Sequence, residues 1–421
     1  MSNDWRSCDG YREALAAATP ADSMASVSRR GLLVGLGMGA VGWLAANPTL
    51  AQIAVRPGSR NQRVLVVVFL RGGMDGLNVV VPKEDAYYRL RPSLGLKGKS
   101  LLPLDDFYSF NAKLAPLLPI YRDGRLALIH AVGSNDHSHS HFEAMSAMEH
   151  GLPQAGSGTA SGWLARHLES TRADTSNPLR AVALGSTMPD SLRGASQAIA
   201  IESVADYRLT ADDPEFRKTL GDLYGNGKDP YTEAGHATLE VLDTLNRLNP
   251  AAYRPSVRYP KTDVANALQQ VAFLIKANIG VEVAALDKGG WDTHVAEAQW
   301  LDANLDDLAQ SLAAFYTDLG GETARTTVVV QTEFGRRAAE NSGLGTDHGR
   351  GSVMFMLGGE VRGGKVYGEW PGLEPNQLED PGDLRVTTDY RRPLAEALRH
   401  CGNPNPSAVF PGFVEQPLGL L

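Results

Sequence analysis

The sequence predicts an α/β fold with a mostly parallel central sheet and helices on both faces. Continuous apolar runs without polar alternation, such as RVLVVVFL at residues 63–70, are typical of strands that are buried on both faces. Segments with helical spacing lie between these runs, and this alternation predicts β-α-β units. Ligands of such sheets bind beyond the carboxyl ends of the strands, so the residues that follow each strand are the candidates for a functional site.

The predicted strands share short apolar runs that end in polar or glycine-rich loops. The first, at residues 63–70, is followed by the loop RGGMDG, and the second, LALIHAVG, by SNDHSHSHFE. Further apolar runs of this kind are found at residues 179–185, 197–203, 281–288, 326–332 and 352–358.

Helices are predicted from apolar residues at helical spacing between these strands. The segment NAKLAPLLPIYRDG, residues 111–124, has a helical pattern, and residues 296–321 form a long amphipathic pattern that ends in two glycines. Residues 205–280 are predominantly helical in pattern, and we expect them to form a helical insertion in a single domain that spans residues 52–421.

Residues 1–51 are predicted to be a twin-arginine signal peptide and leader. Arg29 and Arg30 precede a mildly apolar, glycine-rich stretch from Gly31 to Ala46, and small residues suited to cleavage follow near Ala51. An uncleaved N-terminal anchor is the alternative. We expect the twin-arginine translocation machinery as a partner, a periplasmic or secreted location, and no stable membrane span after cleavage.

The charge of the chain bears on the class of ligand. The 421 residues carry a net charge of -8 without acidic or basic blocks. Nucleic-acid binding needs a face rich in lysine and arginine, so we expect no nucleic-acid partner. A small anionic substrate is compatible with this charge, because a metal ion or an arginine can make one cleft locally positive.

Carboxylates and imidazoles follow four of the predicted strands, and a fifth loop adds another pair. Carboxylate oxygens and imidazole nitrogens at one sheet edge are the ligands that a divalent ion such as zinc, manganese, magnesium or calcium requires, and two ions about 3.5 to 4 Å apart would suit phosphoryl transfer. These residues are Asp75, then His137, His139 and His141, then Asp292 and His294, then Glu333, and finally Asp347 and His348.

Each loop also has a purely structural interpretation. Asp75 can belong to an ordinary turn, Asp292 can cap the following helix, and the three alternating histidines can lie in a solvated loop. Glu333 and Arg336 can pair with each other at the start of a helix. One shared site explains all five loops together. It makes Glu333 a ligand or an acid that orients a ligand, and Arg336 a clamp for an anion.

Four segments carry a resemblance to a known family. They read LVVVFLRGGMDGLNVVVP, SHSHFEAM, GGWDTH and TEFGRRAAENSGLGTDHGRGSVMFMLGG. They resemble a family of twin-arginine-exported bacterial proteins, the domain-of-unknown-function family 1501, which is placed in the alkaline phosphatase and sulfatase superfamily. The resemblance covers nearly all of the predicted mature chain and implies an alkaline phosphatase-like fold.

The resemblance also implies roles for individual residues. Asp75 stands where the superfamily has a metal-binding aspartate at the end of its first strand. Ser140 stands as the hydroxyl nucleophile, with Ser138 as the second match. Asp292 and His294 stand as ligands of one metal ion.

The remaining motif departs from the superfamily pattern. Glu333 occupies the strand end where an aspartate and histidine pair is expected, and the pair Asp347 and His348 follows about fourteen residues later. Either the ligands have moved into that loop or one metal site is altered.

The sequence therefore predicts an exported, metal-dependent hydrolase or phosphotransferase-like protein that acts on phosphate or sulfate esters. The alternative is a non-catalytic exported binding or assembly protein that retains the fold.

Overall fold

The computed structural model describes residues 62–156, 159–171, 177–207, 214–225, 227 and 229–421. The expected signal peptide and leader, residues 1–51, lie outside the described residues. Among the helices of the described ranges, none has the length and apolar character that a membrane crossing requires.

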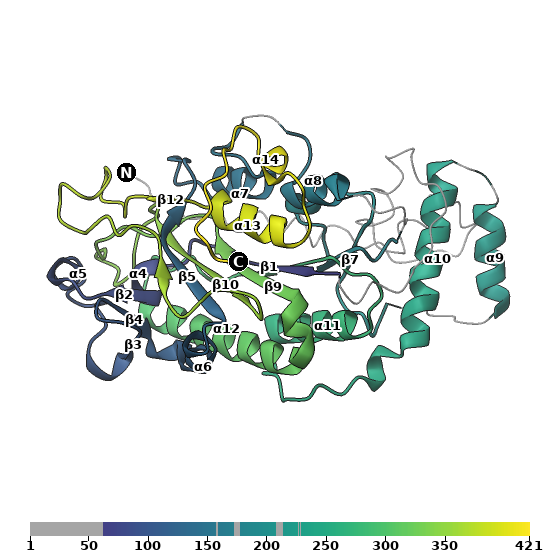
Figure 1. Cartoon of the computed structure of the whole chain (residues 1–421), viewed down its shortest axis with the longest axis horizontal. Coiled ribbons are helices and arrows are strands. Elements are labelled where there is room, and N and C mark those ends of the chain that lie inside the picture. The colour runs from purple at the N-terminus through teal and green to yellow at the C-terminus, as the bar shows by residue number, and fades with distance from the viewer. Residues whose placement is uncertain (1–61, 157–158, 172–176, 208–213, 226, 228) are drawn as a thin grey trace, which may run out of the picture. The chain divides into compact units, whose positions relative to one another are not determined.

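A nine-stranded sheet forms the centre of the fold, with the order β11-β5-β10-β9-β1-β8-β6-β7 and with β12 paired to β5 (Figure 1). All strand pairs are parallel except those of β10 with β5 and with β9. The strands are β1 (Val64–Leu70), β5 (Leu126–Gly133), β6 (Ala181–Leu184), β7 (Ala198–Ile201), β8 (Val283–Lys288), β9 (Thr326–Thr332), β10 (Ser352–Gly358), β11 (Val366–Tyr367) and β12 (Thr388–Asp389). The predicted sheet, mostly parallel with seven apolar runs as strands, is confirmed.

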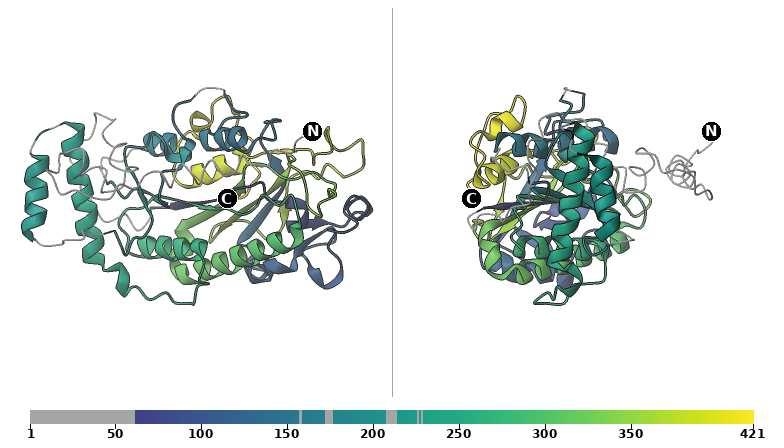
Figure 2. Two further views of the ribbon diagram at one scale, coloured as in Figure 1. Left: turned by 180° about the vertical axis from the view of Figure 1, so that it is seen from behind. Right: turned by 90° about the vertical axis from the view of Figure 1, so that its right-hand side faces the viewer.

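Helices cover both faces of this sheet, as the sequence predicts (Figure 2). Alternate residues of β1 point to opposite faces: Val66 and Val68 join the core under α11 and α12, whereas Leu65 and Val67 join the core under α8 and α13. The longer helices are α7 (His141–His150), α8 (Trp163–Ser170), α11 (Asp263–Lys276), α12 (Glu297–Leu319) and α13 (Arg391–His400). The short ones are α4 (Gly76–Val79), α5 (Asp85–Leu90), α6 (Leu118–Arg122) and α14 (Pro406–Val409).

The expected helical insertion contains two kinds of helix. Helices α9 (Pro214–Tyr224) and α10 (Pro230–Leu248) pack against each other beyond the β7 edge of the sheet (Figure 1). Helix α11 instead packs against α12 and β8, because Val264, Leu268 and Val271 form an apolar stripe that is buried in the core. A small antiparallel sheet of β2 (Val80–Pro82), β4 (Tyr108–Asn111) and β3 (Leu101–Pro103) was not predicted.

Candidate metal centre

The sheet topology brings four loops to one edge. Strands β5, β9, β1 and β8 run in the same direction, so the loops that follow them leave from the same edge. Strand β10 runs in the opposite direction, and its first residue, Ser352, therefore lies at that edge too. The antiparallel strand thus places the loop that contains His348 beside the loops that contain His141, Asp292 and Glu333.

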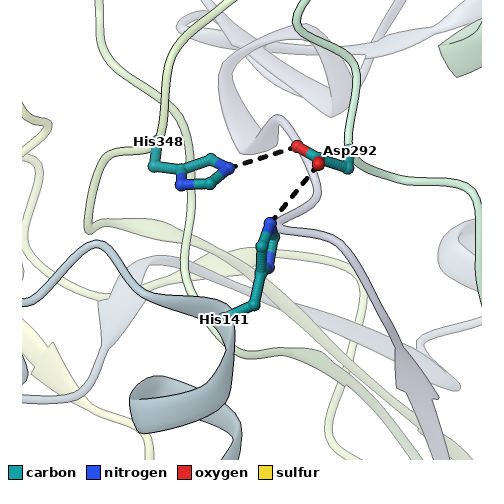
Figure 3. A group of neighbouring side chains, drawn as sticks. All are labelled: His141, Asp292 and His348. Carbon is teal, nitrogen blue, oxygen red and sulfur yellow. Dashed lines mark hydrogen bonds and ion pairs between the residues drawn. The ribbon is translucent and has the colours of Figure 1, made fainter. Parts of the chain in front are cut away.

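Three imidazoles converge on the carboxylate of Asp292. Its Oδ1 lies 3.2 Å from His348 Nε2 and its Oδ2 lies 3.5 Å from His141 Nε2 (Figure 3). His294 Nε2 lies 3.0 Å from the same Oδ1. One ligand atom from each of His141, Asp292 and His348 lies within 4.8 Å of the other two. His294 Nε2 lies 2.9 Å from His348 Nε2, so it adds a fourth donor beside this group.

The opposite nitrogen of each ring faces an acceptor. His141 Nδ1 lies 2.7 Å from Glu333 Oε1, His348 Nδ1 lies 2.8 Å from the carbonyl oxygen of His139, and His294 Nδ1 lies 3.5 Å from Asp347 Oδ1. An imidazole that donates from Nδ1 has its lone pair on Nε2. Carboxylate or carbonyl acceptors behind the histidines are typical of metal sites, where they fix the tautomer and the orientation of the ring.

The contacts of Asp292 and His141 shift the pKa values of both side chains. Burial raises the pKa of Asp292, but hydrogen bonds from the three histidines and from Arg336 outweigh it and hold that pKa well below its ordinary range. Burial lowers the pKa of His141, but hydrogen bonds to Asp292 and Glu333 outweigh it and raise that pKa to about 9. Without a metal ion, the raised pKa of His141 therefore keeps a proton on this ring beside the Asp292 anion, and a divalent ion would compete with that proton for Nε2.

The donor set fits a single divalent ion. The Nε2 atom of His141 is buried, and its contact with Asp292 Oδ2, at 3.5 Å, is long for a hydrogen bond, whereas Glu333 holds the Nδ1 side of the ring. Imidazole nitrogens with one carboxylate suit zinc and other borderline transition metals better than magnesium or calcium, which prefer oxygen. Side chains of Asp292 and His294 are 49% and 39% exposed, so solvent or a small ligand can reach the cluster.

Glu333 orients a ligand rather than pointing at the cluster. Its side chain is fully buried, and Oε1 accepts hydrogen bonds from both His141 Nδ1 and the backbone nitrogen of Gly72, at 2.7 and 2.8 Å. Its other oxygen accepts from Thr332 Oγ1. The close approach of the Gly72 loop requires glycine, because a Cβ there would lie 2.5 Å from the nitrogen of Asp292.

The expected ligand role of Asp75 is contradicted by its surroundings. The side chain is 1% exposed, and its two oxygens accept hydrogen bonds from Arg91 at 2.5 and 2.8 Å. Burial raises the pKa of Asp75, but the Arg91 guanidinium outweighs it and lowers that pKa. Glu297, buried nearby, has its pKa raised to about 8 by burial and by the charge of Asp75. Asp75 thus belongs to a buried ionic group.

The anion clamp expected of Arg336 is also contradicted. Its guanidinium is fully buried and donates to Asp292 Oδ1 at 2.8 Å and to four carbonyl oxygens, those of Gly72, Gly73, Trp291 and Thr346. A guanidinium that is surrounded in this way cannot grip a substrate. It holds three loops and Asp292 together instead.

The last two predicted residues lie beside the cluster. Asp347 accepts a hydrogen bond from Asn341 at 3.0 Å and faces the Nδ1 side of His294, so it lies behind this histidine and not among the converging nitrogens. Ser140 directly precedes His141 at the start of α7, and its side chain makes no capping hydrogen bond.

Sequence reasoning named His141 without preferring it, and it missed two charged residues that pair with residues of the motif loops. It did not single out His141 among the three histidines of its loop, although His141 is the one whose ring reaches Asp292. It also missed Asp383, which is fully buried and whose Oδ2 lies 2.6 Å from His139 Nε2. Arg91 was not considered. No sequence spacing links Arg91 or Asp383 to the motif loops.

Comparison with known proteins identifies the family of the chain. The family model described as "Protein of unknown function (DUF1501)" matches residues 127–390. The chain belongs to this DUF1501 family. The matched range includes every residue of the histidine cluster. No curated protein matches the sequence.

Solved structures that are similar to this DUF1501 protein include two kinds of enzyme. The structure of Ps i-CgsB in complex with k-i-k-neocarrahexaose is 10% identical, with 84% of this chain and 73% of that chain covered and a TM-score of 0.38. BT1596, a 2-O GAG sulfatase, is 10% identical over 72% of this chain and 66% of that chain, with a TM-score of 0.31. A TAB5 alkaline phosphatase mutant with bound Mg is 13% identical, with 72% of this chain and 91% of that chain covered and a TM-score of 0.29. At these identities and TM-scores the similarities assign no role to any residue.

Proposed function

We propose that this DUF1501 protein is an exported hydrolase that uses one divalent metal ion to cleave phosphate or sulfate esters. The observation that supports the metal is the convergence of His141, His294 and His348 on Asp292, each ring with an acceptor behind its Nδ1. The proposal uses one ion rather than two, because the Asp75 carboxylate is paired with Arg91. The described residues also contain only one group of side chains that could hold a metal ion.

The metal ion, when bound, would act as a Lewis acid that activates a hydroxyl and offsets negative charge on the ester. His141, His348 and Asp292 would hold it, with His294 beside them. Glu333 keeps the lone pair of His141 Nε2 directed at the cluster, because it accepts the proton of Nδ1. Solvent-exposed Asp292 and His294 mark the side from which the ester would enter.

Ser140 is the proposed nucleophile. It precedes His141, and its side chain is not used as a helix cap. Attack of its Oγ on phosphorus or sulfur would break the bond to the alcohol, which would leave with the serine proton. Water would then cleave the serine ester and release phosphate or sulfate. His139 Nε2 faces the buried carboxylate of Asp383, so only Nδ1 of that ring could act as a base.

Binding of the substrate anion is assigned to Arg337 rather than to Arg336. The Arg337 side chain is 36% exposed, and its closest carboxylate oxygen, in Asp347, is 3.8 Å away. Its Nε makes no hydrogen bond. A guanidinium in this state can donate two parallel hydrogen bonds to the oxygens of a phosphate or sulfate group.

The test is an assay of purified mature protein against aryl phosphate and aryl sulfate esters, with zinc, manganese, magnesium or calcium supplied. We expect turnover that depends on a transition metal, and Ser140→Ala should abolish it while metal content and the unfolding temperature stay unchanged. Turnover that persists in Ser140→Ala would remove the nucleophile assignment.

A non-catalytic binding protein is the second candidate. The buried ion pair of Asp75 with Arg91 favours it, because Asp75 stands where the superfamily has a metal-binding aspartate. Stoichiometric metal without turnover of any ester would decide for this candidate. Export is tested separately: replacement of Arg29 and Arg30 by lysine should stop periplasmic accumulation in a fractionated culture.

A further inference from the structure

Three exposed apolar side chains lie next to or within a few residues of the cluster histidines in the sequence. Phe142 is 85% exposed, Val295 is 65% exposed and Leu344 is 53% exposed. Phe142 follows the cluster residue His141 and Val295 follows His294, whereas Leu344 belongs to the loop that leads to His348. We call these three side chains the apolar rim. Large apolar groups that gather around a polar site are unusual for a surface and are typical of ligand contact.

Backbone contacts show that two parts of the apolar rim are neighbours. The nitrogen of Ala296 donates to the carbonyl of Gly343 at 3.0 Å, and the nitrogen of Glu297 donates to the carbonyl of Leu344 at 2.9 Å. The next residue, Gly345, packs so closely on the chain that a Cβ there would lie 2.2 Å from the carbonyl oxygen of His294. The turn that carries Leu344 is therefore fixed against the segment that carries His294 and Val295.

Leu344 is poorly explained by folding alone. Its φ is +56°, in the left-handed region where glycine or asparagine is the usual residue. A leucine at this position has backbone strain and also exposes its side chain to water. Neither stability nor solubility favours it, so a contact made by the side chain is the remaining physical reason for it.

We infer that the substrates are amphiphilic: phosphate or sulfate monoesters of an apolar alkyl or aryl alcohol, whose organic group lies on Phe142, Val295 and Leu344. This inference rests on the proposed function. The anionic head would be held at the metal-loaded cluster, where Arg337 lies beside the carboxylate of Asp347. The alcohol group would then extend over the apolar rim, which removes apolar surface from water on both partners.

Non-hydrolysable analogues test the inference without turnover. The affinities of zinc-loaded full chain for methylphosphonate and hexylphosphonate are measured by calorimetry, with methylsulfonate and hexylsulfonate as a parallel pair. We expect the hexyl compound to bind at least about tenfold more tightly than the methyl compound in at least one pair, because a longer chain buries more apolar surface. In Phe142→Ser and in Leu344→Asn this preference should shrink several-fold, while the affinity for the methyl compound is kept.

Val414→Ser is the matched control, because Val414 is 75% exposed and belongs to the C-terminal segment, which contains none of the motif loops. It should keep the full hexyl preference. Leu344→Asn places a residue that tolerates the left-handed conformation, so a loss of preference in that variant cannot come from a damaged fold.

The outcomes separate this inference from the proposed function. Equal binding of methyl and hexyl compounds by the wild type, or an unchanged preference in both rim variants, would disprove substrate binding by the apolar rim. The proposal of a metal-dependent hydrolase would not be affected. No binding of any phosphonate or sulfonate by the zinc-loaded chain would overturn the proposed function, and this inference with it.

Discussion

Glu333 Oε1 lies 2.7 Å from His141 Nδ1, and this contact joins a fully buried glutamate at the end of β9 to the first residue of α7. This pair joins two segments that are 192 residues apart in the sequence. It leaves His141 Nε2 as the free nitrogen of the ring, aimed at Asp292. The role of a glutamate at the tip of a buried strand is thus to orient an imidazole.

Glu333→Gln should weaken metal binding by about tenfold to a hundredfold, because a neutral amide is a weaker acceptor for the proton of His141 Nδ1. The measurement is zinc affinity by competition with a coloured chelator. Glu340→Gln is the matched control. Glu340 lies in the loop that follows Glu333, and its carboxylate accepts hydrogen bonds from the backbone nitrogens of Ser93 and Leu94 rather than from a histidine. Equal zinc affinity in the wild type and in Glu333→Gln would disprove the orienting role.

Asp383→Asn should lower metal affinity by less than Glu333→Gln, by about tenfold at most. Asp383 holds the ring of His139, and the carbonyl oxygen of His139 accepts from His348 Nδ1 at 2.8 Å. His139 has φ +52°, a conformation that needs such support. The same chelator competition measures the effect, and Asp389→Asn, which changes a separate pair with Arg391, serves as the control. An effect larger than that of Glu333→Gln would assign His139 or Asp383 a more direct role.

Asp75→Asn should destabilise the fold by about 3 kcal/mol and leave the metal stoichiometry unchanged. The reason is that the fully buried guanidinium of Arg91 would lose its counter-charge. Urea unfolding gives the free energy of unfolding, and elemental analysis gives the metal content. A stable Asp75→Asn protein that has lost its metal would restore Asp75 as a ligand.

Glu297 should make the stability of the protein fall as the solution becomes more alkaline. Its pKa is raised from 4.5 to about 8, by burial and by the charge of Asp75. The folded state keeps a proton that the unfolded state releases, so the free energy of unfolding decreases as the pH rises from about 4.5 to about 8 and levels off above. Glu297→Gln, which mimics the protonated acid, should lack this component. If the free energy of unfolding, measured with urea, had the same pH dependence in the wild type and in Glu297→Gln, the raised pKa of Glu297 would be contradicted.

The sequence carried enough information for the fold and for three of the four residues of the cluster. Apolar runs identified the strands, and the strand-end rule brought Asp292, His294 and His348 together. The direction of β10 was not predictable, because a strand buried on both faces has the same apolar pattern in a parallel and an antiparallel position.

The errors concern charges whose partners are distant in the sequence. Asp75 follows its strand as a ligand would, but Arg91, from the chain after α5, neutralises it in the core. Arg336 has the chemistry of an anion clamp, but the carbonyl groups of the surrounding loops take up its donors. Composition and spacing do not show which partner a buried charge will meet.

The most direct test of the metal centre is a crystal of the protein grown with zinc, with anomalous diffraction measured at the zinc absorption edge. We expect one anomalous peak per chain, at about 2 Å from His141 Nε2, His348 Nε2 and an oxygen of Asp292. No peak at this position, or a peak bound only at Asp75 or elsewhere in the chain, would contradict the account.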